Sequence, residues 1–307
     1  MSEDRLIHLP TRGLDLCYRL DGSGDGPVVV LIMGLGMQLV AWPQALVDGL
    51  LAQGCRVLRL DNRDIGRSGS GPLRSHTPVK RALLRYLLHL PFVPPYGIDD
   101  MAYDALALCD ALNLPPVHLV GASLGGMIAQ KAAVLAPQRV ASIVSIMSSA
   151  GSRAAPWPDW SVLPLFLTRP PSQASLARRV EHFRRLFERI GAIEEEDERQ
   201  ALEAQLTEAM NRAYRPAGTA RQLLAVLADP DRSAEVRRIS CPVTLIHGER
   251  DPLVRIAAAE HMARLLPQAH FQRIERFAHH LPTWSIPVLN DAIGAHLQRA
   301  GALNSPH

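Results

Sequence analysis

One serine in this chain of 307 residues is enclosed by glycines at the junction between two sequence patterns. The β-branched run 117–120 predicts a strand, and residues 124–135 have the apolar spacing of a helix. In a sharp turn between them, the residues two before and two after the serine crowd together, so both have to be small. The pattern G-x-S-x-G meets this need and predicts an elbow that presents the Ser123 hydroxyl as a nucleophile. The full motif reads Gly121-Ala122-Ser123-Leu124-Gly125-Gly126.

A glycine-rich strand–helix turn can instead bind a phosphate group at the N-terminus of its helix. Turns of that kind have the spacing G-x-G-x-x-G or end in Gly-Lys-Ser/Thr, and residues 121–126 have neither. We therefore favour the nucleophile. The positive end of the helix that begins at Leu124 would then face the oxyanion that forms when the serine attacks.

A nucleophilic serine needs a base to remove its proton and an acid to orient that base. With a nucleophile elbow, the acid and then the histidine follow the serine along the chain. Asp251 comes after the strand-like run 243–246, where the loop turns into the next helix, and we favour it over the nearby Glu249. The alternative is that Asp251 only caps the helix that follows at Val254.

The base is expected in the loop after the last strand-like run, residues 277–282. Two adjacent histidines cannot both face one serine, so the residues alone leave His279 and His280 as alternatives. Two backbone N–H groups should complete the site as an oxyanion hole. We expect one from Leu124, directly after the serine, and one from Leu35, whose flanking glycines permit close approach or simply form a tight turn.

The rest of the sequence alternates apolar, β-branched runs with helical segments, which is typical of an α/β fold with a mostly parallel sheet flanked by helices. After Met147 this alternation stops, because residues 150–235 contain several prolines, then long helical stretches and no strand pattern. We expect a core of residues 1–149 and 236–307, with 150–235 inserted as a helical cap. The strands are expected at residues 28–33, 56–61, 117–120, 140–147, 242–247 and 269–274.

Together these pieces resemble the α/β-hydrolase fold superfamily over nearly the whole chain, and in particular its capped bacterial esterases of the aclacinomycin methylesterase type. Residues 61–68, Asp-Asn-Arg-Asp-Ile-Gly-Arg-Ser, resemble the D-x-R-G/D-x-G-x-S turn of that family. Residues 277–282 resemble its G-x-G-H-x-x-P segment, which gives His279 the catalytic place. The resemblance implies a hydrolase without a cofactor, whose triad is Ser123, Asp251 and His279.

Two places differ from the family pattern. The usual His-Gly after the early strand is Met33-Gly34 here, which leaves open what braces the oxyanion loop. The usual glycines before the catalytic histidine are Phe277 and Ala278, whose bulk could narrow the approach to the site. Neither difference touches the three expected triad residues.

The expected reaction is hydrolysis of carboxylic esters of small hydrophobic substrates through an acyl-enzyme on Ser123. Trp157, Trp160 and Phe166 lie at the start of the expected cap and either line an acyl pocket or pack between cap and core. The same triad also serves lactonases, carbon–carbon bond hydrolases, aminopeptidases and perhydrolases of this fold, and a non-catalytic ligand receptor can retain it. Haloalkane dehalogenases and epoxide hydrolases are disfavoured, because they have Asp in the place of Ser123.

Charge and cysteine placement argue against other kinds of partner. The net charge is only +3 and the arginines are spread along the chain, which is unlike a nucleic-acid-binding protein. Four scattered cysteines without a CxxC pattern favour reduced thiols over disulfides or a metal site. Without a signal sequence or an apolar span long enough for a membrane, we expect a cytoplasmic protein whose partner is a small-molecule ester. No pattern indicates an oligomeric state.

A short helical segment near residue 85 combines leucines with basic residues. A basic amphipathic helix can lie on a membrane surface, but at this length we expect the leucines to pack against the protein itself. The apolar face consists of Leu83, Leu84, Leu87 and Leu88, and the opposite face of Arg81, Arg85 and His89.

Overall fold

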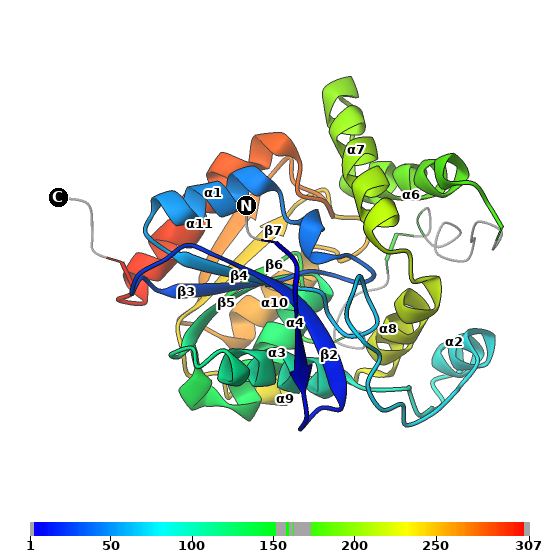
Figure 1. Cartoon of the computed structure of the whole chain (residues 1–307), viewed down its shortest axis with the longest axis horizontal. Coiled ribbons are helices and arrows are strands. Elements are labelled where there is room, and N and C mark those ends of the chain that lie inside the picture. Colours follow the sequence, from blue (N-terminus) through cyan, green and yellow to red (C-terminus); the bar gives the residue numbers. More distant parts are fainter. Residues whose placement is uncertain (1–2, 152–157, 160–161, 163–172, 304–307) are drawn as a thin grey trace.

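A sheet of eight strands runs through the molecule, with helices on both of its faces (Figure 1). The computed structural model describes residues 3–151, 158–159, 162 and 173–303. The strands lie in the order β1-β2-β4-β3-β5-β6-β7-β8, and neighbours from β4 to β8 are all parallel. Their bounds are β1 Arg5–Leu9, β2 Leu14–Asp21, β3 Val28–Ile32, β4 Arg56–Leu60, β5 Val117–Ala122, β6 Val140–Ile146, β7 Val243–Gly248 and β8 His270–Ile274.

The expected α/β fold with a mostly parallel sheet is confirmed, and all six expected strands are present. The sequence reading missed β1 and β2, which form an antiparallel hairpin at one edge of the sheet. In β2, Leu14 and Leu16 are buried while Asp15 between them is exposed. This alternation, which follows a turn at Gly13, is typical of a strand with one face on the core and could have predicted the hairpin.

Two layers of helices cover the sheet. On one face α3, α4 and α10 share a buried apolar cluster with the strands, and on the other face α1 and α11 share a second cluster (Figure 1). The helices are α1 Gln44–Ala52, α2 Val79–Leu87, α3 Ile98–Ala111, α4 Leu124–Leu135, α6 Leu176–Gly191, α7 Glu196–Arg212, α8 Pro216–Ala228, α9 Ser233–Val236, α10 Ala257–Leu265 and α11 Ile286–Arg299.

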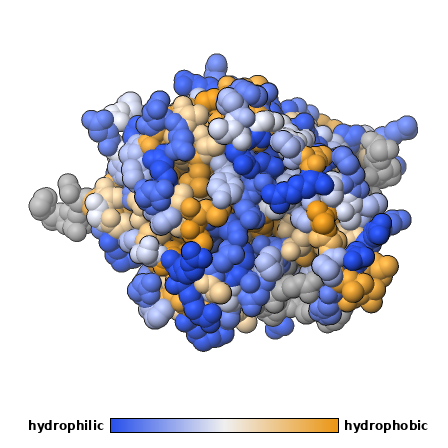
Figure 2. All heavy atoms as spheres, turned by 90° about the horizontal axis from the view of Figure 1, so that it is seen from below, coloured by the Kyte–Doolittle hydropathy of each residue, from blue (hydrophilic) through white to orange (hydrophobic). Residues whose placement is uncertain are grey.

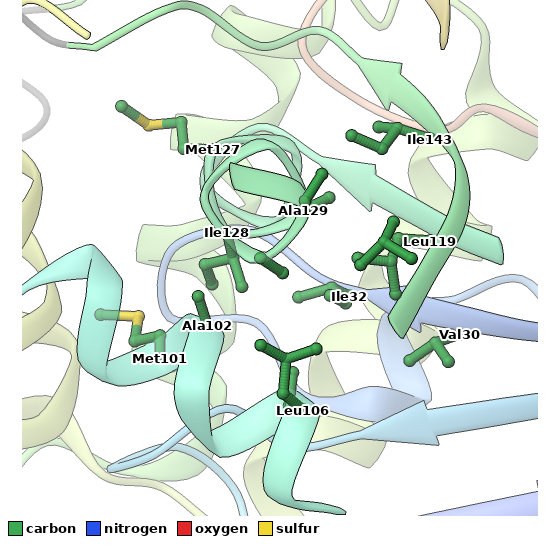
Figure 3. Packing of buried hydrophobic residues seen from close by; sticks show 14 of the residues in the cluster. Val30, Ile32, Met101, Ala102, Leu106, Leu119, Met127, Ile128, Ala129 and Ile143 are labelled. Atoms are coloured by element: carbon green, nitrogen blue, oxygen red, sulfur yellow. The ribbon is translucent and has the colours of Figure 1, made fainter. Parts of the chain in front are cut away.

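Helix α4 packs against both the sheet and α3, and this packing fixes the residue that precedes it (Figure 3). Ile128 and Ala129 of α4 belong to the same buried cluster as Ala102 of α3 and Ile32 of β3. Because apolar interiors are close-packed, a helix held on two sides in this way has little freedom to shift. The N-terminus of α4, which directly follows Ser123, is therefore held in one place relative to the sheet.

Between β6 and β7 every regular element that the structure describes is a helix. This segment contains α6 to α9, of which α6 and α7 project beyond the sheet in Figure 1. The chain leaves the core near Ala150 and returns beside it at Arg232. The Arg232 N–H donates a hydrogen bond to the Ala150 carbonyl over 2.8 Å. The segment is thus inserted into the core through two adjacent connections.

The expectation that the leucines of α2 pack against the protein is wrong for three of the four. Leu84, Leu87 and Leu88 are 57%, 50% and 58% exposed, whereas Leu83 is half-buried. Leu83 belongs to the inward face of α2, whose residues have the spacing i, i+3, i+4, i+7 of one helix face. Those residues are Val79, Ala82, Leu83 and Tyr86, which are buried or half-buried. None of the helices in the described part of the chain is long and apolar enough to cross a bilayer.

One buried histidine makes the fold sensitive to acid. His296 of α11 has its Nδ1 atom 2.9 Å from Thr244 Oγ1 and its Nε2 atom 2.7 Å from Ser142 Oγ. Burial, reinforced by the positive charge of Arg299, lowers the pKa of His296 to about 3. The unfolded chain therefore binds a proton at His296 at a pH where the folded protein does not. Stability is lost as the pH falls from about 6.5 to about 3.

We expect His296→Gln to weaken this pH dependence, because glutamine can hydrogen-bond in the core but cannot take up a proton. Between pH 7 and pH 5, the loss in free energy of unfolding should be about 2 kcal/mol smaller in the variant than in the wild type. Urea unfolding at the two pH values measures it. The exposed His76 offers the control, since His76→Gln should keep the wild-type dependence. Equal losses in all three proteins would contradict the assignment.

Candidate active site

The turn at Ser123 has the strained backbone that the glycine pattern predicts. Ser123 has φ 54° and ψ −117°, a conformation rare for residues with a side chain. A Cβ atom on Gly121 would lie 2.2 Å from the Gly125 carbonyl oxygen, and one on Gly125 would lie 1.9 Å from the Ile32 carbonyl oxygen. Only glycine fits at either position. The two glycines let β5 turn directly into α4 with the serine at the bend.

Ser123, His279 and Asp251 lie in one series of hydrogen bonds. The Ser123 Oγ atom is 2.9 Å from His279 Nε2, and His279 Nδ1 is 2.6 Å from Asp251 Oδ2. Asp251 and His279 are buried, whereas Ser123 is half-buried and can be reached from solvent. With the His279 proton on Nδ1 and donated to the carboxylate, Nε2 is free to accept the serine proton.

The loop that carries Asp251 is closed by its own hydrogen bonds. The second carboxylate oxygen of Asp251 accepts from the N–H groups of Leu253 and Val254, at 2.9 and 2.8 Å. Asp251 therefore caps this turn and also faces the histidine. It does not cap a helix as the alternative expected, because α10 begins only at Ala257. Its rival Glu249 is exposed to solvent.

His247, a residue that the sequence reading did not single out, also lies beside this carboxylate. It lies fully buried near the end of β7. Its Nε2 atom donates to the Val254 carbonyl over 2.6 Å and is 3.6 Å from Asp251 Oδ2. Burial lowers the pKa of His247, so its ring is neutral at pH 7 and adds no charge beside the acid. Its spacing of four residues before Asp251 was the available indication in the sequence.

The structure separates the two adjacent histidines. The His279 N–H donates to the Ile190 carbonyl of α6 over 2.9 Å, which holds the His279 backbone in place. His280 turns the other way, where its ring packs near Phe187 and its Cβ lies against Gly191. Desolvation and the neighbouring His279 lower the pKa of His280 to about 4. Of these two histidines, only His279 hydrogen-bonds to the serine and the acid.

The loop after β3 is braced without the usual histidine. Asn62 donates a side-chain hydrogen bond to the Met33 carbonyl over 2.9 Å. On the other side of the loop, Gln222 of α8 accepts from the Gly36 N–H over 2.9 Å and donates to the Arg63 carbonyl over 3.0 Å. Gln222 is fully buried, so both contacts are shielded from water. The sequence offered no local indication of this brace, because its partners come from distant segments.

The two expected oxyanion donors flank the serine. Leu124 is the first residue of α4, and the first N–H groups of a helix have no partner within it. On the other loop Gly34 lies against Ser123, since a Cβ atom there would be 3.2 Å from Ser123 Cβ. The next N–H, that of Leu35, has no hydrogen-bond partner among the described residues. Both N–H groups are thus available to a substrate oxygen.

Helices α7 and α8 are tied to the core by buried ion pairs. Arg212 of α7 lies 2.8 Å from the fully buried Asp61, and Arg221 of α8 makes two hydrogen bonds to Asp64, at 2.8 and 2.7 Å. Burial by itself would raise the pKa of Asp64. Its hydrogen bonds, above all the one with Arg221, outweigh burial, so the pKa is lowered. Asp64 is therefore ionised, and these pairs fix the turn 61–68 that carries Asn62.

Helix α7 also holds the loop that carries His279. Glu198 is buried at the start of α7, and its carboxylate accepts hydrogen bonds from the N–H groups of Thr283 and Trp284, at 3.0 and 3.3 Å. The inserted segment therefore contacts both loops that border Ser123.

The remaining candidate residues lie elsewhere. Trp157, Trp160 and Phe166 fall outside the described residues. Within the described ranges, no group of three His, Cys, Asp or Glu side chains is placed to hold a metal ion.

The chain matches known proteins over most of its length. A family model described as alpha/beta hydrolase fold matches residues 27–285. The chain is 31% identical to the rhodomycin D methylesterase DauP of Streptomyces sp. strain C5, over 95% of this chain and 99% of that one. It is 33% identical to a pimeloyl-[acyl-carrier protein] methyl ester esterase of Nitrosomonas europaea, over 87% of this chain and 94% of that one.

Solved structures share the fold at lower sequence identity. The enol-lactonase of Burkholderia xenovorans LB400 superposes with a TM-score of 0.74 at 20% identity, over 96% of this chain and all of that one. At this level of identity the likeness shows the fold alone.

Proposed function

The chain belongs to the alpha/beta hydrolase fold family and is a hydrolase that acts on ester bonds, and we propose that it cleaves carboxylic esters of small hydrophobic molecules through an acyl-enzyme on Ser123. The hydrogen-bonded series Ser123–His279–Asp251 carries this proposal. A serine, a histidine and a carboxylate in this order are the parts that acyl transfer requires.

In the first step, Ser123 Oγ attacks the ester carbonyl while His279 Nε2 takes the hydroxyl proton. Asp251 stabilises the imidazolium that forms. The N–H groups of Leu35 and Leu124 donate to the oxyanion of the tetrahedral intermediate, and each donor of this kind is worth about 3 kcal/mol of barrier lowering. As the intermediate collapses, His279 gives its proton to the departing alcohol, and the acyl group stays on the serine.

In the second step, water releases the acyl group. His279 removes a proton from the water as it attacks the acyl-enzyme, the same two N–H groups hold the new oxyanion, and the proton passes to Ser123 Oγ as the acid leaves. The N–H groups of Leu253 and Val254 keep the carboxylate of Asp251 in position through both steps.

We propose methanol as the alcohol that leaves. Two relatives that match most of this chain are named for methyl esters, one for rhodomycin D and one for a pimeloyl group. The acids in those names differ, whereas the alcohol is the same. A site that selects a small alcohol and accepts a varied acyl group is consistent with both.

Residues 150–235 are proposed as a helical cap over a core of residues 1–149 and 236–307. The two connections at Ala150 and Arg232 lie side by side, as an insertion requires. Contacts from α6, α7 and α8 to the loops around Ser123 support a role in shaping the site. A lining of the acyl pocket by Trp157, Trp160 and Phe166 stays a prediction.

The proposed triad is tested by substitution, with the two residues that compete with His279 and Asp251 in the sequence, His280 and Glu249, as controls. Ser123→Ala, His279→Gln and Asp251→Asn should each lower kcat on p-nitrophenyl esters by at least about 1,000-fold, because each removes a group that acts in the transition state. His280→Gln and Glu249→Gln should retain most of the wild-type rate. Hydrolysis at the wild-type rate by Ser123→Ala would show that the nucleophile is a different group.

The brace from α8 is tested with Gln222→Met, which keeps the size of the side chain and removes both hydrogen bonds. We expect kcat to fall by about 10- to 100-fold with a smaller change in KM, because the loop that carries the Leu35 N–H loses its support. Gln205→Met is a matched control in α7, where the glutamine donates to the Ala41 carbonyl over 3.0 Å. Equal kcat values for the two variants would rule out the brace.

The alcohol preference is tested with methyl, ethyl and butyl esters of one hydrophobic acid. We expect kcat/KM to fall as the alcohol grows, because a site built for methanol leaves no room for a longer chain. A series of methyl esters with different acids should vary less. Faster cleavage of the butyl ester would contradict the methyl proposal and leave the Ser123 mechanism untouched.

A further inference from the structure

Large apolar side chains exposed to solvent are concentrated on one short segment. Eight are exposed among the described residues, and five of these lie between residues 84 and 93, while the other three are spread over β1, α3 and α6. Figure 2 shows hydrophobic side chains gathered at the right-hand edge of the molecule, the side on which Figure 1 places α2. Patches of this kind mark sites of contact with other molecules. The five are Leu84, Leu87, Leu88, Leu90 and Val93.

The charged side chains in and around this segment are all basic. The longer stretch of residues 65–98 contains five Lys or Arg residues and no Asp or Glu. Two of the five, Arg67 and Arg74, pair with Asp4 and Asp100. The other three are on α2, and in the part of the chain that the structure describes they form no ion pair. These three are Lys80, Arg81 and Arg85.

On α2 the apolar and basic side chains share the outward face. Lys80, Leu84 and Leu88 are spaced i, i+4, i+8, so they follow one line along the helix, with Leu87 beside them. The inward face packs against α8. This outward face combines the two contributions that bind a helix to a membrane interface, which are apolar area that can be buried and positive charge that is attracted to anionic lipids.

The segment is held ready for contact by hydrogen bonds across its base. The Arg74 N–H donates to the Pro95 carbonyl over 2.7 Å, where the chain enters and leaves. Thr77 donates from its side chain to the Val93 carbonyl over 2.9 Å, and Arg85 to the Pro91 carbonyl over 2.7 Å. Because helix and turn are already ordered, binding through them requires little further loss of conformational entropy.

We propose that residues 79–93 bind the surface of an anionic lipid bilayer. The exposed leucines would enter the boundary between headgroups and acyl chains, while Lys80 and Arg81 contact lipid phosphate groups. A second copy of this chain fits less well, because a two-fold contact would bring the basic residues of the two helices together. This surface lies outside the Ser123 site, and the proposal does not depend on the reaction proposed there.

Cosedimentation of the full chain with vesicles tests the proposal. We expect binding to vesicles of phosphatidylcholine mixed with phosphatidylglycerol, weaker binding to phosphatidylcholine alone, and release as the salt concentration rises. The double variant Leu84→Gln with Leu88→Gln should reduce the partition coefficient by on the order of tenfold or more. Its matched control is Leu6→Gln with Leu176→Gln, two exposed leucines on β1 and α6, which should bind as the wild type does.

A second pair of variants tests the charge. Lys80→Glu with Arg81→Glu should lose binding to the anionic vesicles. Arg5→Glu with Arg238→Glu changes the net charge by the same amount at two exposed sites elsewhere and should keep most of it. Equal loss in the two charge variants would show attraction by net charge alone, and the proposal would be wrong.

Three other results would also overturn it. If the wild-type protein does not bind the anionic vesicles, the proposed membrane binding is wrong. A wild-type dimer in lipid-free solution that becomes a monomer in Leu84→Gln with Leu88→Gln, with no vesicle binding, would assign this face to a second copy. Salt-sensitive binding to poly-glutamate without binding to vesicles would assign it to an acidic protein. In every variant, hydrolysis of a water-soluble ester should stay at the wild-type rate, which shows that the fold is intact.

Discussion

The close approach of backbone to backbone at Gly125 is the constraint on which the site depends. Its Cα lies so near the Ile32 carbonyl that no side chain fits, and this contact sets α4 against β3. Ser123 then occupies the bend, with a positive φ that the packing of α4 against the sheet and α3 maintains. The serine therefore lies at the carboxyl end of the central strands, next to an N-terminal helix end and beside the loop after β3. Each group that completes the proposed site is positioned relative to that fixed point.

The three residues of the proposed triad are held by different parts of the chain. Core elements fix Ser123 and, through the turn after β7, Asp251. The loop of His279 and the loop after β3 are held in part by α6 and α8, through the Ile190 carbonyl and the Gln222 side chain. Buried ion pairs from α7 and α8 to the turn 61–68 make that attachment firm. A displacement of α6 or α8 would thus move His279 or the loop after β3 relative to Ser123. In the proposed mechanism, the region proposed as a cap would therefore also affect the rate of cleavage.

Sequence patterns predicted those features that follow from short-range rules. The steric rule of the elbow acts within five residues. The expected acid and histidine each follow a predicted strand, and they come after the serine in the chain order that this elbow requires. The choice between His279 and His280 needed the family resemblance, because a hydrogen bond to α6 orients the loop. Gln222 could not be found locally, since its partners are far away in the chain. Three of the four leucines of α2 were misjudged because Leu83 forms the inward face with Val79, Ala82 and Tyr86 and not with the other leucines.

Mass spectrometry of a trapped acyl-enzyme tests the central claim most directly. The intact protein, quenched in acid during turnover of a slowly hydrolysed ester, should gain the mass of one acyl group, and fragmentation should place that mass on Ser123. The added mass should disappear when turnover is allowed to finish, and it should be absent in Ser123→Ala. Acylation of a residue other than Ser123 would contradict the account. So would turnover of the slowly hydrolysed ester in which no acylated protein accumulates.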